Sequence, residues 1–390
     1  MPLITLTKGT LYMSKNSIKK SKEIFDKITD EENLYNAYKK ALKGKGKYHV
    51  EAMKFALDEV YNLNELRTSL INEAYKFDGY TTFTVYEPKI RVINAPHFKD
   101  KIVQLAINNV LKDVYNPCFI FDSYACIDGK GTHKCVDRIQ HLMRKAKWEY
   151  GETTTILKCD VKKFFYTIDR EVLKSLLPKK VRCKKTLSLL FKIIDSANDI
   201  DLLGLPLGNT ISQLCANIYL NELDQFCKRK LGLRYYSRYM DDTIAFVKDK
   251  QTAKETLKLI TEFVENKLKL TLNKNKSKIF PLEQGVNAIG YKIYPTHRLL
   301  RNDSKKKIKR KNKAIPRLIM EDKMTISKAE QILNSWLGHA KYGDSYNFIK
   351  SLMIKYHFLY LIKGKDKSVL KINYNILKRY YDEHNKNQLP

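Results

Sequence analysis

Arg234-Tyr-Tyr-Ser-Arg-Tyr-Met-Asp-Asp-Thr-Ile-Ala-Phe-Val247 is the stretch that decides the fold of this chain. Its aromatic and β-branched residues predict two short strands joined by a tight turn that carries Asp241 and Asp242. Adjacent carboxylates repel each other and add nothing to a hydrophobic core, but they serve well as ligands of a divalent cation. Many acidic turns are merely exposed to solvent, so the flanking strands and Tyr239-Met240 are what favour a metal site here.

Composition limits the partners of the protein. The chain has 390 residues, 43% of them hydrophobic, enough for a large core and more than one domain. Its formal charge of +31 attracts polyanions, so nucleic acid is the expected partner and a membrane surface the alternative. We find no run of about 18 apolar residues that would span a bilayer. Residues 1–14 lack the features of a secretory signal. We expect a cytoplasmic protein without membrane association.

The cysteines point away from disulfides and zinc. Seven are present, with no Cys-x-x-Cys pair among them, so their spacing supports neither a disulfide framework nor a zinc site. Cys126, His133 and Cys135 are close in sequence, but incidental or buried thiols explain them better than metal ligands. Reduced thiols are the expected state in a cytoplasm.

Hydrophobic periodicity predicts an α+β core between helical flanks. The expected helices include Val50–Ala74, with Met53, Leu57 and Val60 among its apolar residues. Further helices are expected over Lys99–Tyr115, Thr210–Lys230, Ala329–Tyr342 and Tyr346–Ile362. Strands are expected over Thr81–Tyr86, Lys89–Ile93, Thr153–Cys159 and Asn287–Tyr294. The first two strands form a hairpin interrupted at Glu87-Pro88. A basic run, Lys305 to Lys313, follows a shift in composition. We divide the chain into 1–76, 77–296 and 297–390.

Asp160 is the carboxylate that would complete the metal site. It follows an apolar strand, where an unpartnered carboxylate is costly to bury. Two strands of one sheet would bring it to Asp241 and Asp242. Three carboxylates around two Mg²⁺ ions suit in-line phosphoryl transfer, because one ion activates the attacking hydroxyl and the other neutralises the leaving group.

Six motifs in a fixed order resemble those of reverse transcriptases. They are the basic hairpin, Lys158-Cys-Asp-Val-Lys-Lys-Phe-Phe165, Gly204-Leu-Pro-Leu-Gly-Asn-Thr-Ile-Ser-Gln213, Tyr239-Met-Asp-Asp242, Leu272-Asn-Lys-Asn-Lys-Ser277 and Ala288-Ile-Gly-Tyr291. The resemblance covers residues 77–296. It implies a right-hand polymerase that copies RNA into DNA, with an N-terminal helical extension at 1–76, fingers and palm at 77–296, and a basic helical thumb at 297–390.

The resemblance also implies the cofactors and the metal ligands. Asp160, Asp241 and Asp242 would bind two Mg²⁺ ions, for which Mn²⁺ could substitute, and the Val161 carbonyl would be a further ligand. The substrates would be deoxynucleoside triphosphates. The nucleic-acid partners would be a template RNA and the RNA/cDNA duplex, gripped by the lysine-rich thumb through shape and phosphate contacts. A solvated lysine face is the plainer interpretation of that thumb.

Other positions match the family's nucleotide-binding residues. Phe165 matches the aromatic ring that excludes a 2′-hydroxyl, although Phe164 next to it competes for that role. Lys89 and Arg91 match the fingers cations that clamp the triphosphate, and Arg offers a planar fork for phosphate oxygens. Solvated basic residues are the alternative in so cationic a chain.

Two further motifs concern the leaving group and the primer. Lys276 would protonate the departing pyrophosphate, with Lys274 and Lys278 as competitors. Gly290 and Tyr291 would form the primer grip beneath the growing 3′ end. An ordinary strand with a close-packed glycine is the alternative for that pair.

The residues around Leu207 and Gln213 suggest a subfamily. Many reverse transcriptases carry glutamine and proline at these two positions, whereas the pattern here is similar to the enzymes of diversity-generating retroelements. Ser123 to His133 also resembles that group, but Ala288-Ile289 and Tyr166-Thr167 depart from common family patterns. The resemblance implies error-prone copying at adenines, aided by a small basic accessory protein. The apolar Leu207 side chain cannot hydrogen-bond around the nascent base pair. A mismatched pair would therefore lose less binding energy there than beside a hydrogen-bonding residue.

Three alternatives stay open at this point. Defence-associated bacterial reverse transcriptases share the same catalytic motifs. A non-catalytic, maturase-like RNA-binding protein would be expected to lose a metal carboxylate, and all three are present. A template-independent terminal transferase would use the same aspartates. We find no endonuclease or ribonuclease H pattern.

Overall fold

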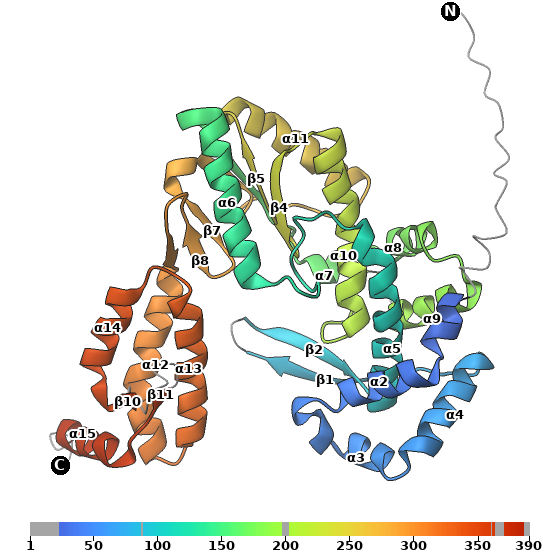
Figure 1. Ribbon diagram of the computed structural model, residues 1–390, viewed down its shortest axis with the longest axis horizontal. Coiled ribbons are helices and arrows are strands. Elements are labelled where there is room, and N and C mark those ends of the chain that lie inside the picture. Colours follow the sequence, from blue (N-terminus) through green and yellow to red (C-terminus); the bar gives the residue numbers. More distant parts are fainter. Residues whose placement is uncertain (1–22, 87–88, 197–202, 360, 363–369, 386–390) are drawn as a thin grey trace, which may run out of the picture. The chain divides into compact units, whose positions relative to one another are not determined.

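The computed structural model describes residues 23–86, 89–196, 203–359, 361–362 and 370–385. The N-terminal residues 1–14 and the predicted break at Glu87-Pro88 lie outside this range. Two compact units make up the chain (Figure 1). Unit 1 comprises Met1–Gly129, Lys158–Thr243 and Lys254–Lys278, and unit 2 comprises Lys130–Leu157, Ile244–Ala253 and Ile279–Pro390.

Several helices of unit 1 begin at polar caps. Asp30, Asp169 and Asn209 each accept a hydrogen bond from a backbone N–H in the first turn of the helix that follows, which satisfies a donor with no partner inside the helix. The helices are α2 (Glu31–Ala41), α3 (Val50–Ala56), α4 (Glu59–Ile71), α5 (Phe98–Tyr115), α7 (Phe164–Thr167), α8 (Arg170–Leu176), α9 (Lys184–Asp195) and α10 (Thr210–Gln225). Most of α11 (Lys250–Asn266) also belongs to unit 1.

The prediction of one continuous helix over Val50–Ala74 was wrong. The Asp58 carboxylate accepts a hydrogen bond from the backbone N–H of Tyr61 and starts a new helix, so α3 and α4 are separate. Met53, Leu57 and Val60 are then 53%, 87% and 67% exposed. The apolar residues of this stretch are therefore largely on the surface, because the break at Asp58 changes the direction of the chain.

Two sets of strands carry the sequence motifs. The predicted basic hairpin is confirmed: β1 (Tyr80–Val85) pairs antiparallel with β2 (Arg91–Pro96), with Val85 opposite Arg91. A second sheet contains β3 (Thr155–Cys159), β4 (Tyr235–Tyr239), β5 (Asp242–Val247) and β6 (Lys278–Pro281) in the order β4-β5-β3-β6. β5 and β3 are neighbours in that order, so the acidic turn and Asp160 start from adjacent strands, as predicted.

The loop before α10 packs on two other motifs. The backbone N–H of Asn94, in β2, donates to the carbonyl of Leu207 over 2.7 Å. The N–H of Leu205 donates to the carbonyl of Phe165 over 2.7 Å. Gly208 has φ +102°, and a Cβ there would lie 2.8 Å from Ile93 Cγ2 and 3.1 Å from the Asn94 carbonyl oxygen. Glycine is required because β2 approaches the loop so closely.

We expect Gly208→Ala to lower the free energy of unfolding by about 2 kcal/mol, through strained backbone and the collision with β2. Gly232→Ala is the matched control, since Gly232 has φ +64° and an added methyl group would meet open space, with nothing within 4 Å. Urea denaturation of both variants separates the cost of the strained backbone from the cost of the collision with β2. Equal losses would show that the contact with β2 adds nothing.

Unit 2 combines a long helix, a small sheet and the C-terminal helices. α6 (Thr132–Tyr150) packs near a three-stranded sheet of β7 (Val286–Ala288), β8 (Tyr291–Ile293) and β9 (Arg298–Leu300). The C-terminal elements are α12 (Asn302–Met320), α13 (Ile326–Lys341), α14 (Tyr346–Lys355), the short pair β10 (Leu361–Ile362) and β11 (Leu370–Lys371), and α15 (Tyr374–Asn385). Ile315, Leu333, Leu337 and Leu352 belong to the buried core that joins these helices.

Two predictions for unit 2 need correction. Asn287–Tyr294 is a hairpin, not one strand, because Ile289 and Gly290 have φ of 48° and 88° and form a two-residue turn. The predicted helix Tyr346–Ile362 ends early, at Lys355.

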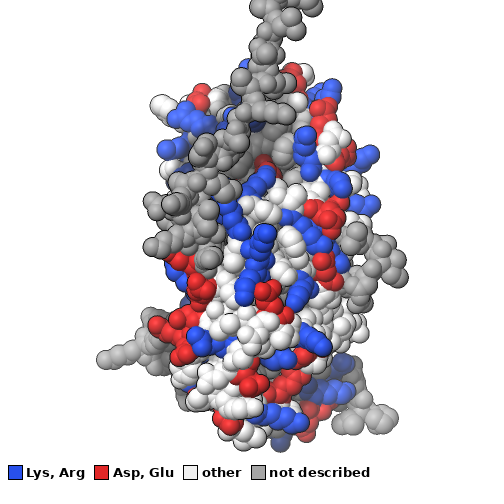
Figure 2. Space-filling model, turned by 90° about the vertical axis from the view of Figure 1, so that its right-hand side faces the viewer, with Lys and Arg blue, Asp and Glu red and all other residues white. Residues whose placement is uncertain are grey.

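The surface is strongly charged. On the face seen in Figure 2, Lys and Arg side chains are widespread and Asp and Glu lie among them. Across the described residues, no helix has both the length and the apolar character needed to cross a membrane.

Candidate active site

The two acidic residues lie at a tight turn in unit 1. Met240 and Asp241 connect β4 to β5, and Met240 has φ 53°, which is uncommon for a residue with a side chain. Asp241 and Asp242 are half-buried. The turn thus holds two carboxylates partly out of water, where they are expensive unless a cation is nearby.

Asp160 is fixed by the loop that contains Lys276. The Asp160 carbonyl accepts a hydrogen bond from the N–H of Asn273 (2.7 Å), and its own N–H donates to Ser277 Oγ (3.2 Å). Lys276 Nζ donates to both carboxylate oxygens of Asp160, at 2.9 and 2.7 Å. Asp160 is only 4% exposed. The hydrogen bond to Asp160 raises the pKa of Lys276, so this lysine carries its proton at neutral pH.

The three aspartates interact electrostatically. Burial, followed by the negative charges of Asp160 and Asp242, raises the pKa of Asp241 to about 6. Asp242 Oδ1 is buried without a hydrogen bond, although Lys158 Nζ lies 3.1 Å from it. Crowded carboxylates with an unsatisfied buried oxygen are a donor set that suits hard cations such as Mg²⁺. The residues present therefore fit the predicted metal site.

Lysines contact two of these carboxylates. Lys276 binds Asp160 and Lys158 approaches Asp242. As the side chains stand, no group of three or more His, Cys, Asp or Glu in the described part of the chain is arranged to hold a metal ion.

Sequence reasoning missed the residue that supports the acidic turn. Arg238, in β4, is 0% exposed and forms an ion pair with the equally buried Asp224 of α10, with Nη2 2.7 Å from Oδ2. Arg238 Nη1 donates to the Met240 carbonyl over 3.0 Å and to Asn217 Oδ1 over 3.2 Å. Nη2 also donates to Ser123 Oγ over 3.0 Å. One guanidinium therefore ties the turn to α10 and to the segment around Ser123.

A hydrogen-bonded network surrounds this ion pair. Tyr236 donates from its hydroxyl to Asp224 Oδ1 (2.8 Å), and burial raises the pKa of Tyr236 well above its usual value. The N–H of Arg238 donates to the Asp122 carbonyl (2.9 Å). In the sequence, Arg238 is one basic residue among 73, and only its position two residues before Met240 hints at this role.

We expect Arg238→Ala to lower the free energy of unfolding by about 3–5 kcal/mol, because Asp224 would keep an uncompensated buried charge. Arg234→Ala, at an exposed position just before the same strand, should cost no more than about 0.5 kcal/mol. Chemical denaturation followed by circular dichroism measures both. A similar loss in the two variants would contradict the role assigned to Arg238.

The nucleotide-binding candidates of unit 1 occupy different environments. Phe164 is buried, whereas Phe165 is half-buried, so Phe165 is the ring with an open surface. Leu207 is half-buried and Gln213 is exposed on α10. Lys89 and Arg91 are exposed at the end of the β1–β2 hairpin. The hydrogen bonds of Asn94 with Leu207 and of Leu205 with Phe165 join these motifs into one structure.

The candidate primer grip lies in unit 2. Tyr291 is fully buried, and its hydroxyl lies 2.8 Å from both Nδ1 and the carbonyl oxygen of His339 in α13. A Cβ on Gly290 would lie 2.8 Å from His339 Cε1. The Tyr291 hydroxyl donates to the His339 carbonyl oxygen, and burial lowers the pKa of the His339 ring. The hairpin turn is therefore packed directly against α13.

A second aromatic contact joins α6 to the same region. Tyr342 stacks on His133 with ring centroids 3.8 Å apart, and its hydroxyl donates to Asp137. Arg298 Nη1 donates to Asp137 Oδ1 over 2.7 Å, and the guanidinium carbon lies 4.8 Å from the Tyr342 ring centroid. Tyr342 thus packs between elements, as does Trp336, whose ring contacts Phe348 edge-on.

The basic run of the C-terminal region is helical. Lys305 and Lys309 lie on α12, each with Nζ 5.6 Å from the Phe348 ring centroid. A cavity of about 420 Å³ between α12 and α13 is lined by cations and by Trp336 and His339. This arrangement is suited to a phosphate backbone, which basic side chains bind without reading sequence.

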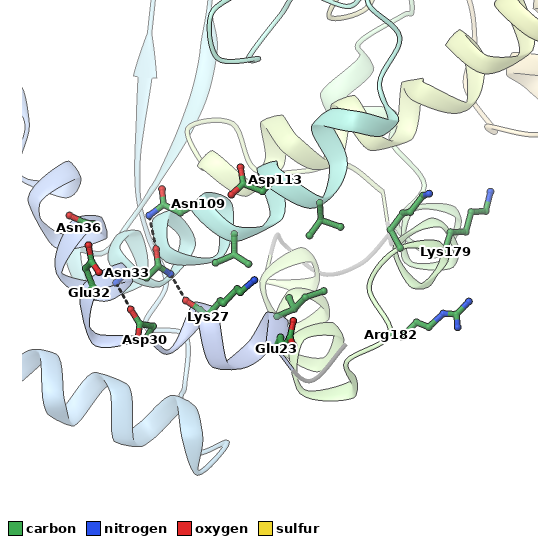
Figure 3. Close-up of a pocket in the computed structure, with 14 residues that line it drawn as sticks. Glu23, Lys27, Asp30, Glu32, Asn33, Asn36, Asn109, Asp113, Lys179 and Arg182 are labelled. Carbon is green, nitrogen blue, oxygen red and sulfur yellow. Dashed lines mark hydrogen bonds between the residues drawn. The ribbon is translucent and has the colours of Figure 1, made fainter. Parts of the chain in front are cut away.

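Another cavity, of about 900 Å³, lies in unit 1 (Figure 3). Lys179 and Arg182 stand on one side of it, while Asn33 and Asn109 stand on the other and hydrogen-bond to each other over 2.9 Å. The Asn33 amide nitrogen also donates to the Lys27 carbonyl (3.0 Å). Carboxylates and cations are mixed along its walls, so it favours no single class of ligand.

The fold and the arrangement of the acidic hairpin define the class of protein. An antiparallel hairpin with a carboxylate turn, a neighbouring strand that is followed by Asp160, and a separate basic β-hairpin are parts of a right-hand nucleic-acid polymerase. The α+β right-hand fold predicted from the sequence is confirmed. A family model described as reverse transcriptase (RNA-dependent DNA polymerase) matches residues 83–293, just over half of the chain. The chain belongs to this family.

Individual relatives are more distant. The group II intron-encoded protein LtrA of Lactococcus lactis subsp. cremoris is 26% identical in an alignment that covers 53% of this chain and 44% of LtrA. Protein YkfC of Escherichia coli K12 is 26% identical over 57% of this chain and 67% of its own length. A putative COX1/OXI3 intron 2 protein of Saccharomyces cerevisiae is 22% identical over 69% of this chain and 38% of its own. The chain spans less than half of LtrA and of the yeast protein.

Among solved structures, the apo telomerase of Candida tropicalis is similar with a TM-score of 0.45 and 12% identity. That match covers 63% of this chain and 54% of the telomerase chain.

Proposed function

We propose that this protein is an RNA-directed DNA polymerase that makes cDNA from deoxynucleoside triphosphates on an RNA template. One observation carries the proposal: Lys276 contacts Asp160, and the charges of Lys276, Asp160, Asp241 and Asp242 act on one another in one cluster. Membership of the reverse transcriptase family supports the reaction class.

Asp160, Asp241 and Asp242 would hold two Mg²⁺ ions, or Mn²⁺ in their place, with the Val161 carbonyl as a further ligand. When bound, such ions activate the primer 3′-hydroxyl and neutralise the charge of the leaving pyrophosphate. Arg238 keeps the turn that carries Asp241 in place through the Met240 carbonyl.

The remaining residues handle the nucleotide and the primer. Lys276 holds its proton beside Asp160 and would donate it to the departing pyrophosphate. Lys89 and Arg91 would bind the triphosphate, and the Phe165 ring would exclude a 2′-hydroxyl. Gln213 would contact the template strand. In unit 2, the Gly290-Tyr291 turn would support the primer end, and the cationic α12 would bind the phosphates of the template–primer duplex.

Asp241→Asn should abolish DNA synthesis and leave RNA binding nearly unchanged. Metal ions contribute several kcal/mol to such transition states, so the rate of nucleotide incorporation should fall at least about 1,000-fold. Primer extension on a defined RNA template measures the rate, and a filter-binding assay measures RNA affinity. Asp249→Asn is the control, because Asp249 caps α11 through Thr252 and asparagine preserves that cap.

The outcome also tests the alternatives. Synthesis that persists in Asp241→Asn would overturn the proposed active site. Product whose sequence ignores the template in the unmutated protein would instead identify a template-independent terminal transferase.

We further propose that copying is error-prone, as in diversity-generating retroelements. Leu207 supports this, since its side chain offers no hydrogen bond and its carbonyl is already bound to Asn94. The position of this loop is fixed by β2, so a change of the side chain alone would alter contacts near the nucleotide without moving the backbone.

Leu207→Gln should reduce misincorporation opposite template adenine by roughly fivefold, if one added hydrogen bond contributes about 1 kcal/mol. Sequencing of cDNA made on an adenine-rich template gives the error rate. Leu203→Gln is the matched control, because Leu203 is an exposed leucine of the same loop. An unchanged error rate in Leu207→Gln would contradict the proposal.

A second role has its own support. LtrA and the yeast relative are named as intron-encoded proteins, which favours an intron RNA as the template or binding partner. An anti-phage defence role would use the same chemistry. The surrounding DNA separates these roles: an adenine-varying repeat pair beside a small basic gene indicates a diversity element, flanking intron RNA indicates the intron role, and a cluster of defence genes indicates the third.

A further inference from the structure

The C-terminal end of α6 carries an aromatic residue with no evident part in the proposed polymerase reaction. Trp148 is 88% exposed, which is unusual because tryptophan is highly buried on average. At this exposure the indole adds little to the packing of unit 2. Trp336, the other tryptophan of the chain, packs edge-on against Phe348 with ring centroids 6.2 Å apart.

A cavity of about 780 Å³ lies beside Trp148 within unit 2. Its volume falls in the range of roughly 300–1,000 Å³ that is common for ligand sites. Arg144, Lys147 and Trp148 of α6 line it together with Glu283 and residues 294–297, which connect β8 to β9. The cavity thus combines an exposed indole, cations and one carboxylate.

The β8–β9 connection provides a second aromatic surface in the cavity. The Tyr294 and His297 rings are stacked, with centroids 4.5 Å apart and planes 15° from parallel. Gln140 of α6 donates to the Tyr294 carbonyl over 3.0 Å, and the Tyr294 N–H donates to the His297 carbonyl over 2.8 Å. The Tyr294 ring also lies so close to Gly285 that a Cβ there would be 2.8 Å away. This wall is therefore held in place before any ligand binds.

Positive charge extends from the cavity along α6. Lys134, Arg138, His141, Lys145 and Trp148 are spaced four, three, four and three residues apart, which places them on one face of the helix. The rise of an α-helix puts Lys134 about 21 Å from Trp148. Lys292 adds a further cation, with Nζ 5.3 Å from the Tyr294 ring centroid. Lys147 is paired with Glu152 at 3.1 Å, and Arg144 lines the cavity beside Trp148.

We infer that this surface binds single-stranded RNA, with one base stacked on Trp148 and the phosphates along the basic face of α6. Stacking on an exposed aromatic ring needs an unpaired base, whereas the bases of a duplex are inaccessible to it. The Glu283 carboxylate accepts hydrogen bonds only and so would favour a base that presents an amino group. The site goes beyond the proposed polymerase function and uses none of its metal-binding aspartates.

The fluorescence of Trp148 can show whether a ligand occupies this surface. In a Trp336→Phe variant Trp148 is the sole tryptophan, so its fluorescence can be followed while the polymerase cleft is first saturated with template–primer duplex. Adding oligoadenylate RNA, whose bases carry amino groups, should then quench the fluorescence to a plateau. Repeating the titration with Asp241→Asn in addition should give the same curve, so that this site is tested even where DNA synthesis fails.

Affinity measurements on the chain without the Trp336→Phe change complete the test. Trp148→Ala should weaken binding of the same RNA about tenfold, since stacking contributes roughly 1–3 kcal/mol per base, and Trp148→Phe should retain most of the affinity. Lys145→Glu should weaken binding and flatten its salt dependence. Tyr48→Ala, at a 70% exposed aromatic of unit 1, is the matched control and should change nothing.

Several results would overturn the inference. The first is Trp148 fluorescence that RNA leaves unchanged. The second is equal quenching by a blunt-ended duplex. The third is an RNA affinity of Trp148→Ala equal to that of the unmutated protein. Quenching by a protein ligand but not by RNA would likewise reject RNA as the occupant. Because Trp148 is exposed, Trp148→Ala should keep its melting temperature, so a lost signal cannot be attributed to unfolding.

Discussion

The buried ion pair between Arg238 and Asp224 is the constraint on which the acidic turn at Asp241 and Asp242 depends. A guanidinium with no solvent exposure must satisfy its donors inside the protein. Arg238 does so by binding α10 and the Met240 carbonyl at once. Such a pair contributes little net stability compared with apolar packing, but it allows few alternative arrangements of its partners. Its effect is to hold the turn before Asp241 in one position relative to α10.

Electrostatics then determines what the turn can bind. Crowding with Asp160 and Asp242 adds to burial in raising the pKa of Asp241, because the negative charges of neighbouring carboxylates repel one another. Lys276 and Lys158 offset part of that charge. Under the proposed function, divalent cations would offset the rest of that negative charge.

In unit 2, aromatic and histidine contacts support the hairpin turn at Gly290, alongside the Arg298–Asp137 ion pair. Tyr291 and His339 join the β7–β8 hairpin to α13, and Tyr342 with His133 joins α6 to the start of the C-terminal segment. A hairpin turn of three-residue strands is weak alone. Its packing against α13 is what makes the Gly290-Tyr291 turn a defined surface, and the same unit displays Trp148 at the other end of α6.

The sequence by itself determined the polymerase family, the β1–β2 hairpin and the strand–turn–strand around Asp241, because these depend on local alternation, turn residues and motif order. Only the tertiary structure decided that Arg238 is fully buried, that Lys276 reaches Asp160, and that Met53 and Leu57 lie on the surface after the break at Asp58. It also showed that Phe165 is half-buried, whereas its neighbour Phe164 is buried. Burial and pairing depend on residues apart in the chain: besides the nearby Met240 carbonyl, Arg238 binds Asp224 and Ser123.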